Sequence, residues 1–167
     1  IFKLRYNLLI IKSIKNKMKK LVFALLGIFM AGAVMAQSEP VKWNFSSKKI
    51  SDKVYEIHLT ATLDNGWHIY SQTQPKDAIS QPTKIAFTSN PLTNLEGSVK
   101  EVGKMEKFHD AALGASANQY SKTVKFVQKV TLKAAAKTSV AGTVEYQLCD
   151  DSKCLPPKKM PFKVNVG

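Results

Sequence analysis

The sequence VYEIHLTATL at Val54–Leu63 alternates apolar and polar side chains from Tyr55 onward. Its apolar positions are Tyr55, Ile57, Leu59, Ala61 and Leu63, and the polar positions between them are Glu56, His58, Thr60 and Thr62. Alternate side chains of a strand point to opposite faces of a sheet. This stretch therefore predicts a β-strand with one face in a hydrophobic core.

A turn signal follows this strand directly. Asp64-Asn65-Gly66 has turn chemistry, because glycine takes positive φ without steric cost. The aromatic segment Trp67-His68-Ile69-Tyr70 then resumes an extended pattern. The two strands are expected to form a hairpin or a tight strand corner.

The rest of the chain also favours short strands, and no amphipathic helical pattern runs for ten residues. About seven strands, separated by clusters of Pro, Gly, Asn and Ser, predict an all-β fold, an immunoglobulin-like antiparallel β-sandwich. Two non-periodic stretches, residues 72–82 and 103–119, are candidate functional loops. The further strands are expected at residues 41–45, 84–88, 124–132, 142–148 and 162–166.

The first 36 residues differ from the rest of the chain. Met18-Lys19-Lys20 is basic, residues 21–34 are almost wholly apolar, and Val34-Met35-Ala36 suits cleavage by signal peptidase. Residues 18–36 are therefore interpreted as a secretory signal peptide, residues 1–17 as an upstream extension, and residues 37–167 as one exported domain. The apolar run is shorter than the roughly 20 residues of a membrane-spanning helix. We expect a periplasmic protein with no stable membrane anchor after cleavage.

Charge sets a further limit on function. The chain has 25 Lys and Arg, 12 Asp and Glu, and a net charge of +13. Seven of the basic residues and no acidic residue lie in residues 1–36, so 18 basic and 12 acidic side chains leave +6 on the predicted domain. No run of Lys or Arg interleaved with aromatics indicates a nucleic-acid surface.

The two cysteines, Cys149 and Cys154, both lie in the exported part, where a disulfide is stable. The pair follows the strand predicted at residues 142–148 and precedes Pro156 and Pro157. Four intervening residues allow the Cα atoms to approach to the range of about 4.4–6.8 Å that a disulfide needs. One interpretation is a structural disulfide, but so short a loop constrains the unfolded chain by only about 2 kcal/mol. The alternative is a reversible disulfide that exchanges with other proteins.

Charged neighbours distinguish the two sulfurs. Asp150 and Asp151 follow Cys149 and disfavour its thiolate, whereas Lys153 precedes Cys154 and favours one. Lys158 and Lys159 lie shortly after. The hypothesis is that Cys154 forms the mixed disulfide with a partner and that Cys149 resolves it.

A metal site is a weaker alternative. Two cysteines supply half of a tetrahedral zinc site, and His58, His68 and His109 are scattered along the chain. Met105 and Met160 are too few to indicate copper. No metal and no cofactor is expected, and a non-enzymatic binding module with an inert disulfide remains the other alternative.

The run from Val144 through Cys149 to Cys154-Leu155-Pro156-Pro157 resembles the N-terminal periplasmic domain of the thiol:disulfide interchange protein DsbD. The segment from Asp64 to Tyr70 is similar to that family's aromatic segment, and Glu106-Lys107-Phe108-His109 is similar to its cap loop. The closing pattern from Tyr146-Gln147 to the two prolines is the most specific part of the resemblance.

The resemblance implies an immunoglobulin-like domain that takes electrons from a thioredoxin-like domain of a membrane electron carrier. It would pass them to periplasmic disulfide-containing proteins such as disulfide isomerases or cytochrome c maturation factors. The second cysteine, Cys154, would form the intermolecular bond. The residues expected around the pair are Phe108, Glu106 and His109 in the cap, and Trp67, Tyr70 and Tyr146 lining the site.

Two departures from the family pattern accompany this resemblance. The sequence ends at Gly167 without an electron-carrying membrane domain, so a reductant in trans is expected. The spacing of Cys149 and Cys154 is one residue shorter than in the best-known members. Loop geometry and redox potential are therefore expected to differ.

Overall fold

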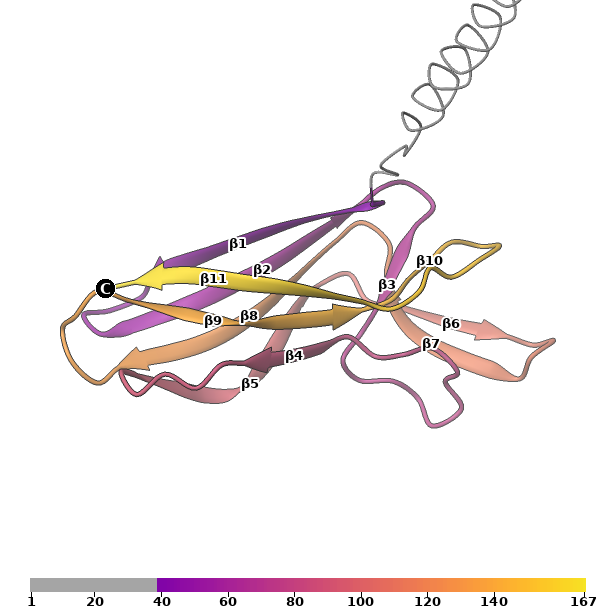
Figure 1. Cartoon of the computed structure of the whole chain (residues 1–167). Coiled ribbons are helices and arrows are strands. Elements are labelled where there is room, and N and C mark those ends of the chain that lie inside the picture. Colours follow the sequence, from indigo (N-terminus) through magenta and orange to yellow (C-terminus); the bar gives the residue numbers. More distant parts are fainter. Residues whose placement is uncertain (1–38) are drawn as a thin grey trace, which may run out of the picture. The chain divides into compact units, whose positions relative to one another are not determined.

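The computed structural model describes residues 39–167, and Figure 1 shows that part as β-strands joined by loops. It contains eleven strands and no helix within those residues, so the all-β prediction is confirmed. The strands are β1 (Val41–Lys49), β2 (Val54–Leu63), β3 (His68–Tyr70), β4 (Lys84–Phe87), β5 (Thr93–Gly103), β6 (Glu106–Asp110), β7 (Ala115–Tyr120), β8 (Thr123–Leu132), β9 (Thr138–Tyr146), β10 (Leu148–Cys149) and β11 (Lys158–Val166).

The signal peptide and the upstream extension, predicted for residues 1–36, lie outside the described residues. From residue 39 onward, no helix has the length and apolar character needed to span a bilayer.

Two antiparallel sheets enclose the main core. The first has the strand order β1-β2-β8-β5 and the third has the order β11-β9-β4. Inward side chains of both sheets belong to one buried cluster, with Phe126 on β8 and Val144 on β9 fully buried. Along one side, Ser47 Oγ of β1 donates a hydrogen bond of 2.8 Å to the carbonyl of Asn165 in β11. The fold is thus an immunoglobulin-like antiparallel sandwich, as predicted.

The strand at Val54–Leu63 has the predicted bounds, and its alternation matches its burial. Its apolar side chains are buried, while Glu56, His58 and Thr60 between them are only half-buried because this central strand also carries β1 and β8 as neighbours. In the antiparallel pairing of β2 with β1, Leu59 lies opposite Phe45. The sequence pattern and the observed burial have the same cause, a sheet with one face against the core.

The predicted turn after β2 is a strand corner and not a hairpin. Gly66 has a φ of 81°, and Trp67 N donates a hydrogen bond of 3.2 Å to the Asp64 carbonyl. Beyond this corner, β3 pairs with β10 and β7 and leaves the sheet of β2. The corner therefore carries the chain from the main sandwich into a second sheet.

The second sheet has the order β10-β3-β7-β6 and holds the cysteines at one edge. Residues 72–82 contain no strand, as predicted. The prediction of a loop throughout residues 103–119 is wrong, because β6 and β7 form a hairpin there. This hairpin extends to the right in Figure 1, beyond the main sandwich. Strand β6 is exposed along most of its length, so it shows no apolar alternation.

Strand β5 was also absent from the predicted strands, and the count is eleven instead of about seven. It is an edge strand with mostly exposed side chains, and its pairing with β8 shifts register between Glu96 and Lys100. Gly97 within this bulge has a φ of 68°. Exposure and the bulge together remove the period-two signal that identifies a strand in sequence.

Candidate functional site

Cys149 and Cys154 form a disulfide. Their Cα atoms lie 4.0 Å apart, closer than the range expected from sequence. The two residues face each other as an isolated antiparallel bridge. Backbone hydrogen bonds on either side, Asp150 N to the Lys153 carbonyl and Leu155 N to the Leu148 carbonyl, fix this register. The cysteines thus occupy a non-hydrogen-bonded pair, where antiparallel chains approach most closely.

The four residues between the cysteines, 150–153, form a tight loop organised by Asp150. Its Oδ1 accepts hydrogen bonds from Ser152 N, Ser152 Oγ and Lys153 N, each 2.8 Å long. These bonds, those of Ser152 first, lower the pKa of the Asp150 carboxyl from its ordinary value. We call residues 150–153 the Cys loop.

The two bonded cysteines differ in exposure. Cys149 is 1% exposed and packs in a small cluster with Tyr70 and Ala117, separate from the main core. Cys154 is exposed. The Cys154 side of the bond therefore lies at the surface, while Cys149 is enclosed.

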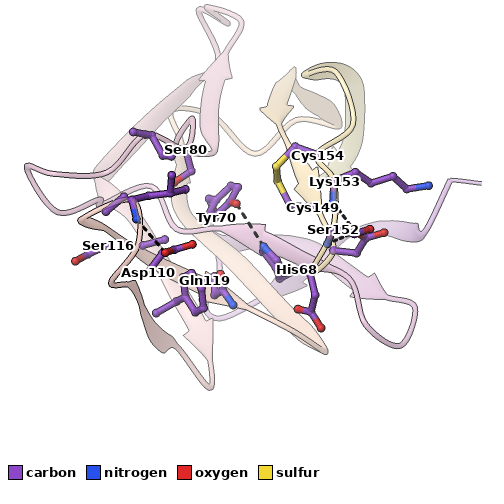
Figure 2. Close-up of a pocket in the computed structure, with 17 residues that line it drawn as sticks. His68, Tyr70, Ser80, Asp110, Ser116, Gln119, Cys149, Ser152, Lys153 and Cys154 are labelled. Carbon is purple, nitrogen blue, oxygen red and sulfur yellow. Dashed lines mark hydrogen bonds between the residues drawn. A yellow bond between two sulfur atoms is a disulfide. The ribbon is translucent and has the colours of Figure 1, made fainter.

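The disulfide forms part of the wall of a pocket of about 390 Å³. Figure 2 shows its labelled residues converging from β3, from the 72–82 loop, from the β6–β7 hairpin and from the Cys loop. The lining residues are His68, Tyr70, Ile79, Ser80, Phe108, Asp110, Leu113, Ala115, Ser116, Ala117, Gln119 and residues 149–154. Three parts of the chain that are distant in sequence thus meet around the disulfide.

Three large apolar side chains of this pocket are exposed. Ile79 is 76% exposed, Leu113 68% and Phe108 51%. We call these three residues the apolar rim. Side chains of this size in solvent beside a reactive bond are typical of a surface that contacts another protein.

His68 and Tyr70 lie on β3 beside the disulfide, and Figure 2 shows them joined by a hydrogen bond. The distance from His68 Nε2 to Tyr70 Oη is 3.3 Å. Burial lowers the pKa of His68, although Asp151, Asp150 and Glu106 oppose that effect. Burial raises the pKa of Tyr70, so its hydroxyl keeps its proton at neutral pH.

Two of the three lysines near Cys154 in sequence form ion pairs with glutamates. Lys158 pairs with Glu39, and Lys159 Nζ lies 3.4 Å from a carboxylate oxygen of Glu145. Lys153 Nζ lies 5.9 Å from the centroid of the Trp67 ring. Lys153, which lines the pocket, is thus the lysine best placed to favour a Cys154 thiolate.

The predicted site residues divide into two groups. Phe108 and Tyr70 line the pocket with both cysteines, and Trp67 contacts the Cys loop through Lys153. The remaining three do not line it. Glu106 on β6 accepts a hydrogen bond from Ser121 Oγ, His109 Nδ1 lies 3.0 Å from Ser116 Oγ, and Tyr146 is in the main core and donates to Glu39 Oε2 at 3.0 Å.

The pocket residues that sequence reasoning did not assign to the site include His68, Ile79 and Leu113. Ile79 and Leu113 are large apolar residues inside the two stretches proposed as functional loops, which is a signal available from sequence. His68 lay inside the recognised aromatic segment. Its position opposite Cys149 depends on the pairing of β3 with β10.

Across residues 39–167, no group of three or more His, Cys, Asp or Glu side chains is arranged to hold a metal ion. With both sulfurs in a disulfide, neither is a thiolate ligand. The chemistry that the arrangement supports directly is exchange at the sulfur–sulfur bond.

Comparison with known proteins gives one family match. The family model described as "Thiol:disulfide interchange protein DsbD, N-terminal" matches residues 35–165, which includes all the strands up to Asn165 of β11. No curated protein matches the chain significantly.

Solved structures of low sequence identity also match. The DsbD N-terminal domain of Neisseria meningitidis in the reduced form has 13% identity, covers 81% of this chain and 93% of that chain, and gives a TM-score of 0.44. A complex of the DsbD and PilB N-terminal domains from the same organism has 13% identity, covers 79% of this chain and 88% of that chain, and gives a TM-score of 0.46. The N-terminal periplasmic domain of ScsB from Proteus mirabilis has 18% identity and a TM-score of 0.49. The match covers 80% of this chain and 48% of that chain, so this chain spans about half of that one.

Proposed function

The chain belongs to the family of the N-terminal domain of the thiol:disulfide interchange protein DsbD, and from that membership we propose that it relays reducing equivalents between proteins through a reversible Cys149–Cys154 disulfide. The donor in this proposal is a thioredoxin-like domain of a membrane electron carrier. The acceptors are disulfide-containing proteins of the periplasm. Export rests on the signal peptide predicted at residues 18–36.

One observation carries the proposal: an exposed Cys154 is bonded to an enclosed Cys149 in the wall of an apolar-rimmed pocket. A purely structural bridge has no need of an accessible sulfur. The unequal exposure also supports the assignment of Cys154 as the sulfur that partners attack.

Reduction of this protein by the donor then proceeds in two steps. A donor thiolate attacks Cys154 Sγ, the bond to Cys149 breaks, and Cys149 leaves as a thiolate that takes up a proton. The donor's second thiolate attacks its own sulfur in the mixed disulfide, so that the donor leaves oxidised and this protein holds two thiols. Transfer to an acceptor is the reverse sequence: Cys154 attacks, and Cys149 resolves.

The apolar rim supports a protein as the partner. Phe108, Ile79 and Leu113 surround the pocket from two separate segments, and covering them removes apolar area from water. Burial of such side chains around an exposed sulfur would hold a mixed disulfide long enough for resolution. No cofactor takes part in any step.

Trapping of mixed disulfides tests this proposal. The Cys149→Ala protein should form a stable mixed disulfide through Cys154 with a thioredoxin-like domain that keeps a single cysteine, activated as its mixed disulfide with thionitrobenzoate, which is the group that leaves; Cys154→Ala should not. The reverse pattern would reverse the two roles. If the unmodified protein keeps its disulfide against a reduced thioredoxin-like domain with both cysteines, or if its reduction potential lies below about −300 mV, the bridge is structural and the relay function is excluded.

A further inference from the structure

We propose that His68 accepts and returns the proton of Cys149 during exchange, and is therefore the acid–base group of the enclosed sulfur. The inference rests on the proposed function, because only a reversible disulfide needs such a group. It assigns a chemical role to a residue that the resemblance to known domains did not single out.

The strand register places the two side chains together. Cys149 on β10 pairs directly with His68 on β3. Residues directly opposite one another in an antiparallel pair point to the same face, with Cβ atoms about 4.5–5.5 Å apart. Both side chains also line the same pocket. An imidazole nitrogen at that separation is within reach of the Cys149 sulfur.

Cys149 needs a proton acceptor in its immediate surroundings. It leaves and attacks as a thiolate, yet it is only 1% exposed, so exchange with bulk water is restricted. Asp150 and Asp151 follow it in the chain, and their charge disfavours a lone thiolate. A neighbouring imidazolium compensates that charge at the moment when the thiolate forms.

The surroundings of the His68 ring suit proton transfer in both directions. Its Nε2 is 3.3 Å from the Tyr70 hydroxyl, which leaves Nδ1 as the second ring nitrogen. A hydroxyl donates to one imidazole tautomer and accepts from the other, so Tyr70 remains a partner in either state. Burial lowers the pKa of His68, which keeps the ring neutral and able to accept a proton at neutral pH.

Charged groups lie near this ring on two elements. Carboxylates on two sides, in the Cys loop and on β6, favour the imidazolium once it forms, while the Cys-loop lysine opposes it. These groups are Asp150, Asp151 and Lys153 in the Cys loop, and Glu106 and Asp110 on β6. The other ionisable neighbour is Tyr70 on the same strand.

In a mixed disulfide at Cys154, the Cys149 thiol transfers its proton to His68, and the Cys149 thiolate attacks Cys154 Sγ. The bond to the partner breaks, the partner sulfur leaves as a thiolate, and the Cys149–Cys154 bond forms. The imidazolium then gives its proton to that thiolate or to water, which restores the neutral ring.

A small disulfide reagent isolates this step without any protein partner. Reduced protein that reacts with 5,5′-dithiobis(2-nitrobenzoate) releases one coloured thiolate when Cys154 attacks and a second when Cys149 closes the internal disulfide. We expect His68→Gln to leave the first release unchanged and to slow the second on the order of 100-fold at pH 7. The defect should disappear at a pH above the Cys149 thiol pKa, where no acceptor is needed.

His58→Gln is the matched control, because His58 lies on β2 and bonds Glu56 outside the pocket. It should leave both releases unchanged. An unaltered second release in His68→Gln, or a defect of equal size at every pH, overturns the proposal. Loss of exchange with a thioredoxin-like donor alone would instead count against the proposed function, because this assay contains no donor.

A second measurement does not depend on the folding of His68→Gln. In the Cys154→Ala protein, the Cys149 thiolate is followed by ultraviolet absorbance and the His68 ring by NMR across pH. The proposal expects coupled titration, with each group shifting the midpoint of the other. Independent titration of the two groups overturns it.

Discussion

The two bonded sulfurs have different surroundings although only four residues separate them. Cys149 belongs to a strand that pairs with β3, so it is held against Tyr70 and Ala117. Cys154 follows the Cys loop, is the second residue of the isolated β-bridge, and is exposed. The local backbone pairing therefore determines which sulfur a partner meets first.

Phe108→Ala should speed reduction of the disulfide by a small thiol severalfold. Phe108 is half exposed on β6 and lines the pocket beside Cys154, so loss of its ring opens the approach to that sulfur. The rate of reduction by a small thiol at fixed pH measures the effect. Leu95→Ala, at an exposed position on β5, should change nothing. An unchanged rate in correctly folded Phe108→Ala would remove this residue from the site.

Asp150→Ala should loosen the Cys loop and make the disulfide easier to reduce. The carboxylate accepts three hydrogen bonds within the loop, and its charge opposes a thiolate on Cys149. Asp150→Asn keeps an acceptor for the turn but removes the charge, so it separates the two causes. The reduction potential should rise in both variants, and hydrogen exchange of the loop amides should increase only in Asp150→Ala. A potential that falls in either variant contradicts this account.

The loop order should also depend on pH in a defined direction. The hydrogen bonds of Asp150 hold its folded pKa below its ordinary value of 3.8. A depressed carboxyl pKa stabilises the folded form above the unfolded pKa, and that contribution is lost as pH falls through the folded pKa. The Cys-loop amides should therefore stay protected at neutral pH and lose protection only below about pH 3.8. Amide exchange measured over an acid pH series checks this, and Asp150→Ala should show no such transition.

At the scale of elements, the 72–82 loop is joined to the β6–β7 hairpin by side-chain hydrogen bonds. Gln74 Nε2 donates to the Asn118 carbonyl at 2.7 Å, and Asn118 N donates to Gln74 Oε1 at 3.1 Å. Ser116 Oγ on the same strand donates to Asp77 at 2.7 Å. These bonds keep Ile79 on one segment and Phe108 on the other around a single pocket.

Gln74→Ala should release the 72–82 loop from β7. Two reciprocal hydrogen bonds to Asn118 are lost, so the free energy of unfolding should fall by about 1–3 kcal/mol. Limited proteolysis within residues 75–82 should become faster. Gln72→Ala is the matched control, because its side chain makes one long bond of 3.4 Å to the Val99 carbonyl. Equal proteolysis of the two variants would show that the Gln74 pair does not anchor the loop.

Sequence predicted those elements whose two faces differ in environment. Strand β2 was identified with its bounds because its alternating apolar side chains, from Tyr55 to Leu63, face the core. Strands β5 and β6 escaped because both are largely exposed, so solvent imposes no alternation on them. At the site, Cys149, Cys154 and the Cys loop could be predicted from the sequence because they are close to one another along the chain. The pairing of β3 with β10, which brings His68 to Cys149, is a long-range contact that no local pattern encodes.

At the scale of the whole molecule, the site is separate from the main hydrophobic core. The core cluster fills the space between the first and third sheets and includes Ile69, Tyr120 and Leu148 of the second sheet, whereas Cys149, Tyr70 and Ala117 form their own cluster in that second sheet. Chemistry at the disulfide therefore disturbs few of the contacts that hold the sandwich together. A protein that cycles between oxidised and reduced forms benefits from this separation, since its fold persists in both.

Reduction of the disulfide should lower the free energy of unfolding by only about 2 kcal/mol, because the bond closes a loop of a few residues in the unfolded chain. The reduced protein should unfold in one cooperative transition with its β-sheet circular dichroism unchanged. Chemical denaturation of the oxidised and reduced forms measures the difference. Phe126→Ala is the comparison, since deletion of this fully buried ring should cost about 3–5 kcal/mol. A reduced protein that loses its sheet, or more stability than Phe126→Ala, would mean that the sandwich depends on the bridge, and a reversible carrier built on this fold would then unfold in each cycle.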